Sequence, residues 1–214
     1  MRFREAVVLD IDETIIDTSL RRQAAWRRVT GLDIPISELE MYGSSHIARK
    51  YYGPGYHPIY LKFWSILLCY DPDGFKLLEM DKPIPYAADT VSIWSRRYTI
   101  VYLTGRTSNM RDATLDELRS MGFPVDPMMI YMAPDLEKYI EDPTSIRRML
   151  LERILEEYRV KIIVDDNPVF FEIYRELGIP IRIGILRPRF RIEDYRYASI
   201  VADSWYSLYS IAAV

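Results

Sequence analysis

From Pro85 onward, short apolar runs rich in β-branched residues alternate with longer segments of helical periodicity. The apolar runs at 98–103, 128–132, 161–164 and 181–186 predict buried strands. The predicted helices lie at about 87–97, 110–121, 146–158 and 169–177. Repeated strand–helix units favour a mostly parallel sheet with helices on both faces. The predicted fold class is therefore α/β, with a Rossmann-like doubly wound sheet.

A first strand is predicted at 6–9, but the regular alternation does not begin there. The stretch 17–84 interrupts it with an expected helix at 19–30, a mixed region rich in Tyr, Gly and Pro, and a helix from Pro58 to Tyr70. We therefore predict a core domain formed by residues 1–16 and 85–214, and a smaller helical domain formed by residues 17–84.

Composition excludes several classes of protein. With 214 residues, of which 49% are hydrophobic and 28% charged, the chain is expected to bury one core and a small satellite domain. A net charge of -3 argues against nonspecific nucleic-acid binding, and no apolar run is long enough to cross a bilayer. The N-terminal residues do not resemble a signal peptide. The single cysteine, Cys69, is interpreted as a core residue and suits a cytoplasmic protein, and the scarcity of Asn and Gln is typical of a thermophile.

Polar clusters follow three of the predicted strands. They are Asp10-Ile11-Asp12, Thr104-Gly105-Arg106 and Asp165-Asp166-Asn167. Parallel sheets bind ligands beyond the carboxyl ends of their strands, so we expect these clusters to meet if the strands are neighbours. Four carboxylates that close repel one another unless a cation lies among them. Oxygen ligands favour a hard divalent ion, so the expected cofactor is Mg²⁺.

With these motifs in this order, the chain resembles the haloacid dehalogenase-like (HAD) hydrolase superfamily. The resemblance rests on Asp-x-Asp-x-Thr after the first strand, on apolar-Thr-Gly-Arg after a later one, and on apolar-Asp-Asp near the end. It covers nearly the whole chain outside the insert. At position 12 the chain has an Asp, and in this it is similar to the phosphatase and phosphotransferase branches of the superfamily. The resemblance also implies that the insert between the first and second motifs is a cap over the site.

The resemblance implies a role for each motif residue. Asp10 would be the nucleophile, and Asp12 would be the general acid and base, with a pKa raised by its neighbours. Thr104 and Gly105 would bind the phosphoryl group. Mg²⁺ would be held by Asp10, by the backbone carbonyl of Asp12 and by Asp166, with Asp165 behind these ligands. Glu13 is interpreted as a solvated neighbour, and Arg106 either contacts substrate or forms a structural ion pair.

The sequence departs from the family pattern at one position. A lysine usually lies near the start of the helix before the last acidic motif, but that helix here begins Thr144-Ser145-Ile146-Arg147-Arg148. Helical spacing favours Arg147 as the replacement over Lys138, and Arg148 stays open as an alternative. An arginine supplies the same charge and a bidentate phosphate contact.

The function expected is hydrolysis of small phosphomonoesters, with Mg²⁺, through an aspartyl-phosphate. The expected partner is a small phosphate ester, and the aromatic insert surface is compatible with a homodimer. Eight insert residues are candidates for contacting the organic part of the substrate, although packing or solvation explains each of them as well: Arg21, Arg22, His46, Arg49, Lys50, Tyr51, Tyr52 and His57. Two alternatives stay open, a nucleotidase or nucleic-acid-end phosphatase, and a noncatalytic phosphate- or metal-binding protein. The sequence leaves the physiological substrate, the oligomeric state and any movement of the cap open.

Overall fold

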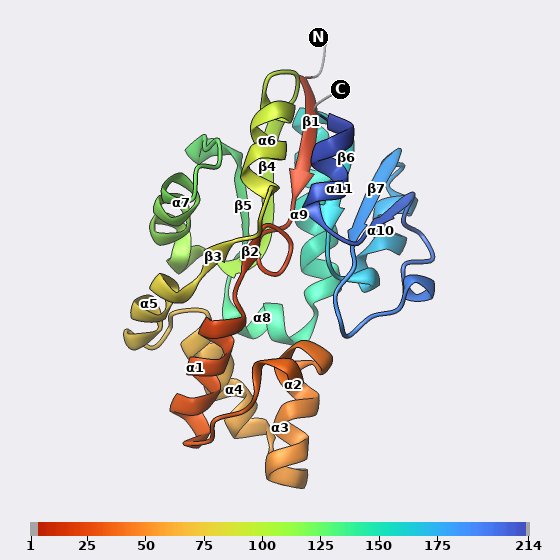
Figure 1. The fold of residues 1–214 in the computed structure, drawn as a ribbon. Helices are drawn as coiled ribbons and strands as arrows, with labels where there is room; N and C mark the ends of the chain where they lie inside the picture. Colours follow the sequence, from red (N-terminus) through yellow and green to blue (C-terminus); the bar gives the residue numbers. More distant parts are fainter. Residues whose placement is uncertain (1–3, 213–214) are drawn as a thin grey trace.

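A computed structural model describes residues 4–212, and its centre is a six-stranded sheet in the order β5-β4-β1-β6-β7-β8. All five strand pairings are parallel, which confirms the predicted α/β class (Figure 1). The strands are β1 (Arg4–Leu9), β4 (Thr99–Thr107), β5 (Ile130–Ala133), β6 (Tyr158–Asp165), β7 (Ile181–Ile185) and β8 (Ile200–Ala202). Strand β1 lies between β4 and β6, so the three strands that precede the polar clusters are neighbours.

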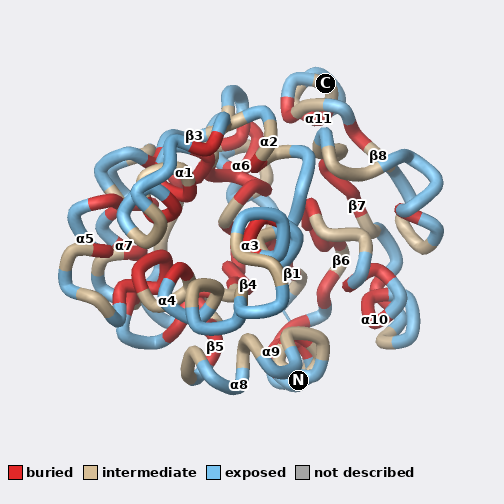
Figure 2. Tube along the Cα trace, turned by 90° about the horizontal axis from the view of Figure 1, so that it is seen from below, coloured by how far each residue is buried: buried red, intermediate tan, exposed pale blue. Residues whose placement is uncertain are grey.

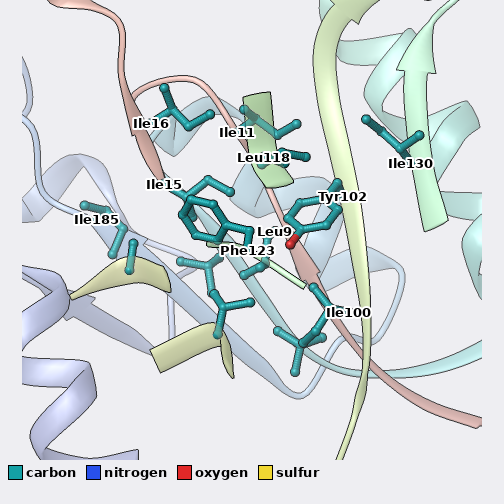
Figure 3. Packing of buried hydrophobic residues seen from close by; sticks show 14 of the residues in the cluster. Leu9, Ile11, Ile15, Ile16, Ile100, Tyr102, Leu118, Phe123, Ile130 and Ile185 are labelled. Carbon is teal, nitrogen blue, oxygen red and sulfur yellow. The ribbon is translucent and has the colours of Figure 1, made fainter. Parts of the chain in front are cut away.

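Alternate residues of β1 build two separate cores. Val7 and Leu9 pack in the cluster that faces α6 (Ala87–Ser95), α7 (Arg111–Ser120) and α11 (Trp205–Ala212), part of which is drawn in Figure 3. Ala6 and Val8 pack in the cluster that faces α9 (Pro143–Glu157) and α10 (Phe171–Glu176). A strand buried on both faces exposes no side chain to water, which explains the unbroken apolar run from Ala6 to Leu9.

The insert has a hydrophobic cluster of its own, in which Trp26 stacks on Phe63 with ring centroids 4.2 Å apart. Its helices are α1 (Ser19–Thr30), α2 (Ile36–Met41), α3 (Ser44–Tyr52), α4 (His57–Leu67) and α5 (Asp73–Leu77). An antiparallel ribbon of β2 (Ile16–Asp17) and β3 (Lys82–Pro83) joins it to the rest of the chain. Figure 1 shows α1 to α4 beyond the end of the sheet at which β1 terminates.

The remaining elements lie in the connections. They are α8 (Leu136–Glu141) and short 3₁₀ helices at Gly53–Gly55, Leu78–Met80, Ser108–Met110, Pro127–Met129, Pro168–Phe170 and Ile192–Asp194. In Figure 2 the buried segments run through the strands, whereas exposed residues lie along the outer helices. Between residues 4 and 212, no helix is both long and apolar enough to cross a membrane.

Two differences from the predicted elements have clear physical reasons. Helix α9 begins at Pro143 instead of about 146, because the Asp142 side chain accepts the backbone N–H of Ser145 at 2.9 Å and a proline suits the first turn. The mixed region of the insert forms two short helices, α2 and α3, whose buried residues number only one and two respectively. Such short helices carry little periodic signal.

Candidate active site

The end of β1 fixes the position of Asp10. Its backbone N–H donates to the carbonyl of Val164 at 3.0 Å, so Asp10 continues the ladder with β6. The chain then turns tightly, because the carbonyl of Ile11 accepts backbone N–H groups from Thr14, Ile15 and Ile16 at 2.9–3.2 Å. This turn brings the Thr14 side chain back toward Asp10.

The Asp10 carboxylate is buried and held on both oxygens. Oδ1 accepts from Nη2 of Arg147 at 2.8 Å, and Oδ2 accepts from the Thr14 hydroxyl at 2.9 Å. Burial and the neighbouring carboxylates of Asp165 and Asp166 raise the pKa of Asp10 well above its usual range, although Arg147 opposes the shift. The site therefore carries more negative charge than its own arginine compensates.

Three carboxylates gather at this point. Asp10, Asp165 and Asp166 each offer one oxygen, and these oxygens all lie within 4.8 Å of one another. Burial and the Asp165 and Glu13 carboxylates raise the pKa of Asp166 to about 7, against the effect of Arg189. Oxygen-only ligands with excess negative charge fit a hard divalent cation such as Mg²⁺.

Asp165 is already satisfied by the protein. Its oxygens accept the Tyr174 hydroxyl at 2.6 Å and the backbone N–H of Asn167 at 2.8 Å. Asp166 differs, because its Oδ2 accepts a hydrogen bond from Nη2 of Arg189 at 2.9 Å and from no other group in residues 4–212. This difference fits Asp166 as a ligand and Asp165 as a support behind it.

Asp12 is not part of this carboxylate group. Its side chain, 30% exposed, accepts from Nη2 of Arg21 at 2.6 Å and from Nε and Nη2 of Arg106 at 2.8–3.1 Å. Burial by itself would raise the pKa of Asp12, but the two guanidinium groups outweigh it and lower the pKa to about 2. The expectation of a raised pKa for Asp12 is therefore wrong for this arrangement. The sequence could not show it, because no local pattern indicates that two arginines converge on Asp12.

Arg106 forms a buried ion-pair network. Besides Asp12, it contacts Glu117 on α7, and its Nη2 lies 3.3 Å from Asp81 Oδ2 at the end of the insert. Of the two interpretations left open for Arg106, the structural ion pair is the one observed. The network links the core strand β4 with both ends of the insert, through Arg21 and Asp81.

Of the three cations considered for the missing motif lysine, Arg147 is the one that reaches Asp10. Its Nη1 donates to the carbonyl of Leu103 at 2.7 Å, and its guanidinium lies over the Phe170 ring, 4.5 Å from the centroid. Lys138 is exposed, with its Nζ 3.5 Å from an Asp135 oxygen, and Arg148 pairs with Glu176 on the surface.

Thr104 and Gly105 lie near the carboxyl end of β4, the strand that pairs with β1. The Thr104 hydroxyl accepts the backbone N–H of Arg106 at 3.1 Å, and no residue in the 4–212 range accepts its proton. Gly105 lines the cavity, and the ring of Tyr139 packs directly against it, so that a β-carbon at 105 would overlap the Tyr139 ring. Tyr139 therefore encloses the site on this side.

Glu13 is not a solvated residue, contrary to the expectation from the sequence. It is buried with a φ of 64°, and Arg187 donates to it at 2.5 Å while the backbone N–H of Thr18 donates at 3.2 Å. The turn after β1 folds Glu13 inward against these partners, which the sequence could not show because Arg187 lies far along the chain.

A cavity of about 520 Å³ opens above these residues, between the sheet and the insert. Arg21, Arg22 and His46 line it, as expected for candidate specificity residues. The other five candidates do not line it: Arg49, Lys50, Tyr51, Tyr52 and His57. Arg49 instead donates to the Tyr56 hydroxyl at 3.0 Å, and Lys50 donates to Glu38 at 2.7 Å, so both serve the insert itself.

Three residues at the site are absent from the set expected from the sequence: Thr14, Tyr139 and Arg189. Thr14 is present in the Asp-x-Asp-x-Thr pattern and could have been chosen from it. Tyr139 and Arg189 lie in connections outside any motif, and they reach the site only through the path of the chain after β5 and β7.

We compared the chain with known protein sequences and with solved structures. No protein-family model matches the sequence, and no curated protein sequence matches it. Among solved structures, a candidate phosphatase from Clostridium difficile aligns with a TM-score of 0.70 at 15% identity, covering 99% of this chain and 100% of that one. A candidate phosphoglycolate phosphatase from Lactobacillus delbrueckii subsp. bulgaricus aligns at 0.69 and 12% identity, covering 99% of each chain.

A HAD family hydrolase from Deinococcus radiodurans, solved with bound phosphate and sodium, aligns with a TM-score of 0.63 at 14% identity and covers 97% of this chain and 94% of that one. The chain has the haloacid dehalogenase-like fold. The superfamily resemblance inferred from the three motifs is thereby confirmed at the level of the fold.

Proposed function

We propose that this protein is a Mg²⁺-dependent phosphatase that hydrolyses small phosphomonoesters through an aspartyl-phosphate on Asp10. One observation carries the proposal: Asp10 is held between Thr14 and Arg147, at the edge of the sheet where two more buried carboxylates gather. The HAD-like fold and the phosphate bound in the Deinococcus radiodurans relative support it.

The chemistry assigned to this chain's residues is as follows. Thr14 and Arg147 orient the Asp10 carboxylate, which attacks phosphorus and displaces the ester oxygen. Arg147, the Thr104 hydroxyl and the backbone N–H of Gly105 would face the negative charge of the phosphoryl group. Asp10, Asp166 and the backbone carbonyl of Asp12 would hold Mg²⁺, which when bound neutralises phosphoryl charge and orients the ester.

Asp12 is proposed to protonate the leaving oxygen and later to activate water. To accept and deliver a proton it has to loosen its contacts with Arg21 and Arg106. Since Arg21 belongs to the insert, a shift of the insert over a bound substrate is one way to loosen the first of these contacts. We propose that the insert is a cap that excludes water from the cavity.

The test is a phosphatase assay on purified protein with Mg²⁺ and then with a chelator. We expect turnover of small phosphomonoesters with Mg²⁺ and loss of at least about 100-fold when the metal is removed. Binding of phosphate without turnover of any ester would instead favour the noncatalytic alternative, which the placement of Arg147 at Asp10 makes less attractive.

A second readout does not depend on turnover. Mg²⁺ is expected to raise the melting temperature, and by more at about pH 8 than at about pH 6, because protons compete with the metal for carboxylates of raised pKa. At a Mg²⁺ concentration of about 100 times Kd, the stabilisation is about 2.7 kcal/mol. Thermal unfolding of the wild type and of Asp166→Asn at both pH values checks this. An equal Mg²⁺ shift in the variant would remove Asp166 from the ligand set.

A further inference from the structure

Two adjacent arginines on α1, Arg21 and Arg22, are buried in the wall of the cavity. They are only 2% and 6% exposed, although both side chains line the cavity above Asp10. Removing a guanidinium from water is costly unless carboxylates and hydrogen bonds compensate its charge fully. The partners of these two residues therefore show whether the protein by itself completes their pairing.

The pairing of Arg21 is incomplete. Its Nη2 donates to Asp12. Its buried Nε lies 3.2 Å from Asp81 without forming a hydrogen bond, and neither Nε nor the buried Nη1 has a hydrogen-bond partner within residues 4–212. Arg106 contacts the same two carboxylates, so Arg21 has no carboxylate to itself. A donor in a cavity wall with no acceptor in the chain points to an acceptor on a ligand.

Arg22 is also short of negative charge. Its Nη2 donates to the backbone carbonyl of Leu39 at 2.7 Å, and its carboxylate partner, Glu13, lies 3.8 Å from Nη1. Glu13 already accepts from Arg187 and from Thr18. Burial lowers the pKa of Arg22, with Glu13 only partly opposing it, as expected for a guanidinium whose compensation is incomplete.

The roof of the same cavity supplies further donors. Helix α3 begins after Gly43 with no side-chain cap, and its first three residues, Ser44, Ser45 and His46, line the cavity. The first backbone N–H groups of a helix have no partner within the helix and favour an anion or another acceptor. The free Nη1 of Arg21 is the independent sign that this region faces a ligand.

We propose that the substrate of this phosphatase carries a second anionic group, a carboxylate or a second phosphate, which binds Arg21, Arg22 and the first turn of α3. The inference rests on the proposed function, because Arg147 and Gly105 are assigned there to the phosphoryl end. A cavity of about 520 Å³ is of a size that takes a whole small organic molecule rather than a phosphate alone. Aromatic residues of α4 and α8, Tyr60, Trp64 and Tyr139, would flank the organic part between the two anions.

Binding of non-hydrolysable phosphonates with Mg²⁺ present tests the proposal by titration calorimetry. The probes are ω-phosphonocarboxylates, ω-hydroxyalkylphosphonates and α,ω-bisphosphonates, compared at each chain length from two to five carbons. The hydroxyl-ended compound is the neutral control, and the carboxylate and bisphosphonate arms distinguish the two sources of the second anion. We expect the better doubly anionic compound to bind about 10- to 100-fold more tightly than its neutral counterpart, as charge-assisted hydrogen bonds would give.

The variant for this test is Arg22→Gln, because Arg21 also contacts Asp12 and a change there would alter two features at once. We expect Arg22→Gln to reduce the affinity ratio of charged to neutral compounds to within about 3-fold. Arg27→Gln, on the same helix with a side chain 68% exposed, is the matched control and should keep the wild-type ratio. Thermal unfolding of each variant reports whether it is folded.

The outcomes separate the two proposals. Equal affinity of charged and neutral compounds for the wild type overturns the second-anion site, whatever the variants do, and leaves the phosphatase proposal intact. A wild-type preference that persists in folded Arg22→Gln overturns the assignment to this wall. Tighter binding of the charged compounds without Mg²⁺-dependent hydrolysis of any ester overturns the phosphatase proposal and, with it, the description of the ligand as a substrate.

Discussion

Asp10→Asn is expected to abolish phosphomonoester hydrolysis, with kcat lowered by at least about three orders of magnitude. An amide does not attack phosphorus as a carboxylate does, and no carboxylate in residues 4–212 other than Asp10 is held by both Thr14 and Arg147. Asp165 and Asp166 are close, but the former is engaged by Tyr174 and the latter by Arg189. Neither is therefore placed to take over as nucleophile. Steady-state assays with Mg²⁺ measure the loss.

The same substitution is expected to leave the melting temperature unchanged or to raise it at about pH 8. A charge on Asp10 is unfavourable in the folded state, because burial and the neighbouring carboxylates raise its pKa. When folding raises the pKa of a carboxyl group, the stability of the protein falls as pH increases from the unfolded pKa to the folded pKa of that group. The neutral amide cannot ionise, so it removes a cost that is greatest at high pH. The oxygen of the new amide side chain can still accept from Arg147.

Asp116→Asn is the matched control, since its side chain is exposed and pairs only with Arg119 one turn away on the same helix. It should retain wild-type kcat. Full activity in folded Asp10→Asn would contradict the assignment of Asp10 as nucleophile. Inactivity in both variants would show that the assay reports something other than the site.

The parts of the fold that could be predicted from the sequence are those held together by local and periodic signals. In β6, for example, Ile162, Ile163 and Val164 form an apolar run that is buried on both faces of the sheet. Helix α1 spans the predicted residues, and Gly31 fixes its end in a left-handed conformation. Strand β8 and helix α11 were not predicted. Strand β8 has only three residues at the edge of the sheet, so it offers no periodic pattern to recognise.

At the site, the motif positions were predictable and the ion pairs were not. Asp10, Thr104 and Asp165 each lie at or near the end of a predicted strand, so the sequence indicated that they would meet if those strands were neighbours, as β4, β1 and β6 are. The partners of Asp12 are different, because Arg21 comes from the insert and Arg106 turns back from the next strand. Their side-chain directions depend on how the insert packs on the sheet, and no local pattern encodes that packing.

Arg147 is the residue whose removal should damage stability and activity together. It compensates two buried carboxylates, with Nη2 2.8 Å from Asp10 and 3.4 Å from Asp165, and it also donates to the carbonyl of Leu103. Breaking a buried ion pair by removing one partner costs about 3–5 kcal/mol, because a buried charge is left without compensation. Arg147→Ala is therefore expected to lower the free energy of unfolding by about that amount, and to lower kcat/KM by at least about 100-fold.

The loss of stability in Arg147→Ala should be larger at about pH 8 than at about pH 5. The raised pKa of Asp10 favours its neutral form at the lower pH, and a neutral Asp10 does not require a cation beside it. Arg147→Lys keeps the charge, but a single ammonium cannot reproduce the planar fork that reaches Leu103 and Asp10 at once. We therefore expect it to recover most of the stability and only part of the activity. Urea unfolding at both pH values, with kcat/KM measured for each variant, tests these expectations.

Arg148→Ala is the control, since the Arg148 side chain pairs on the surface with Glu176. Equal effects of the two alanine variants would mean that Arg147 does not compensate the site.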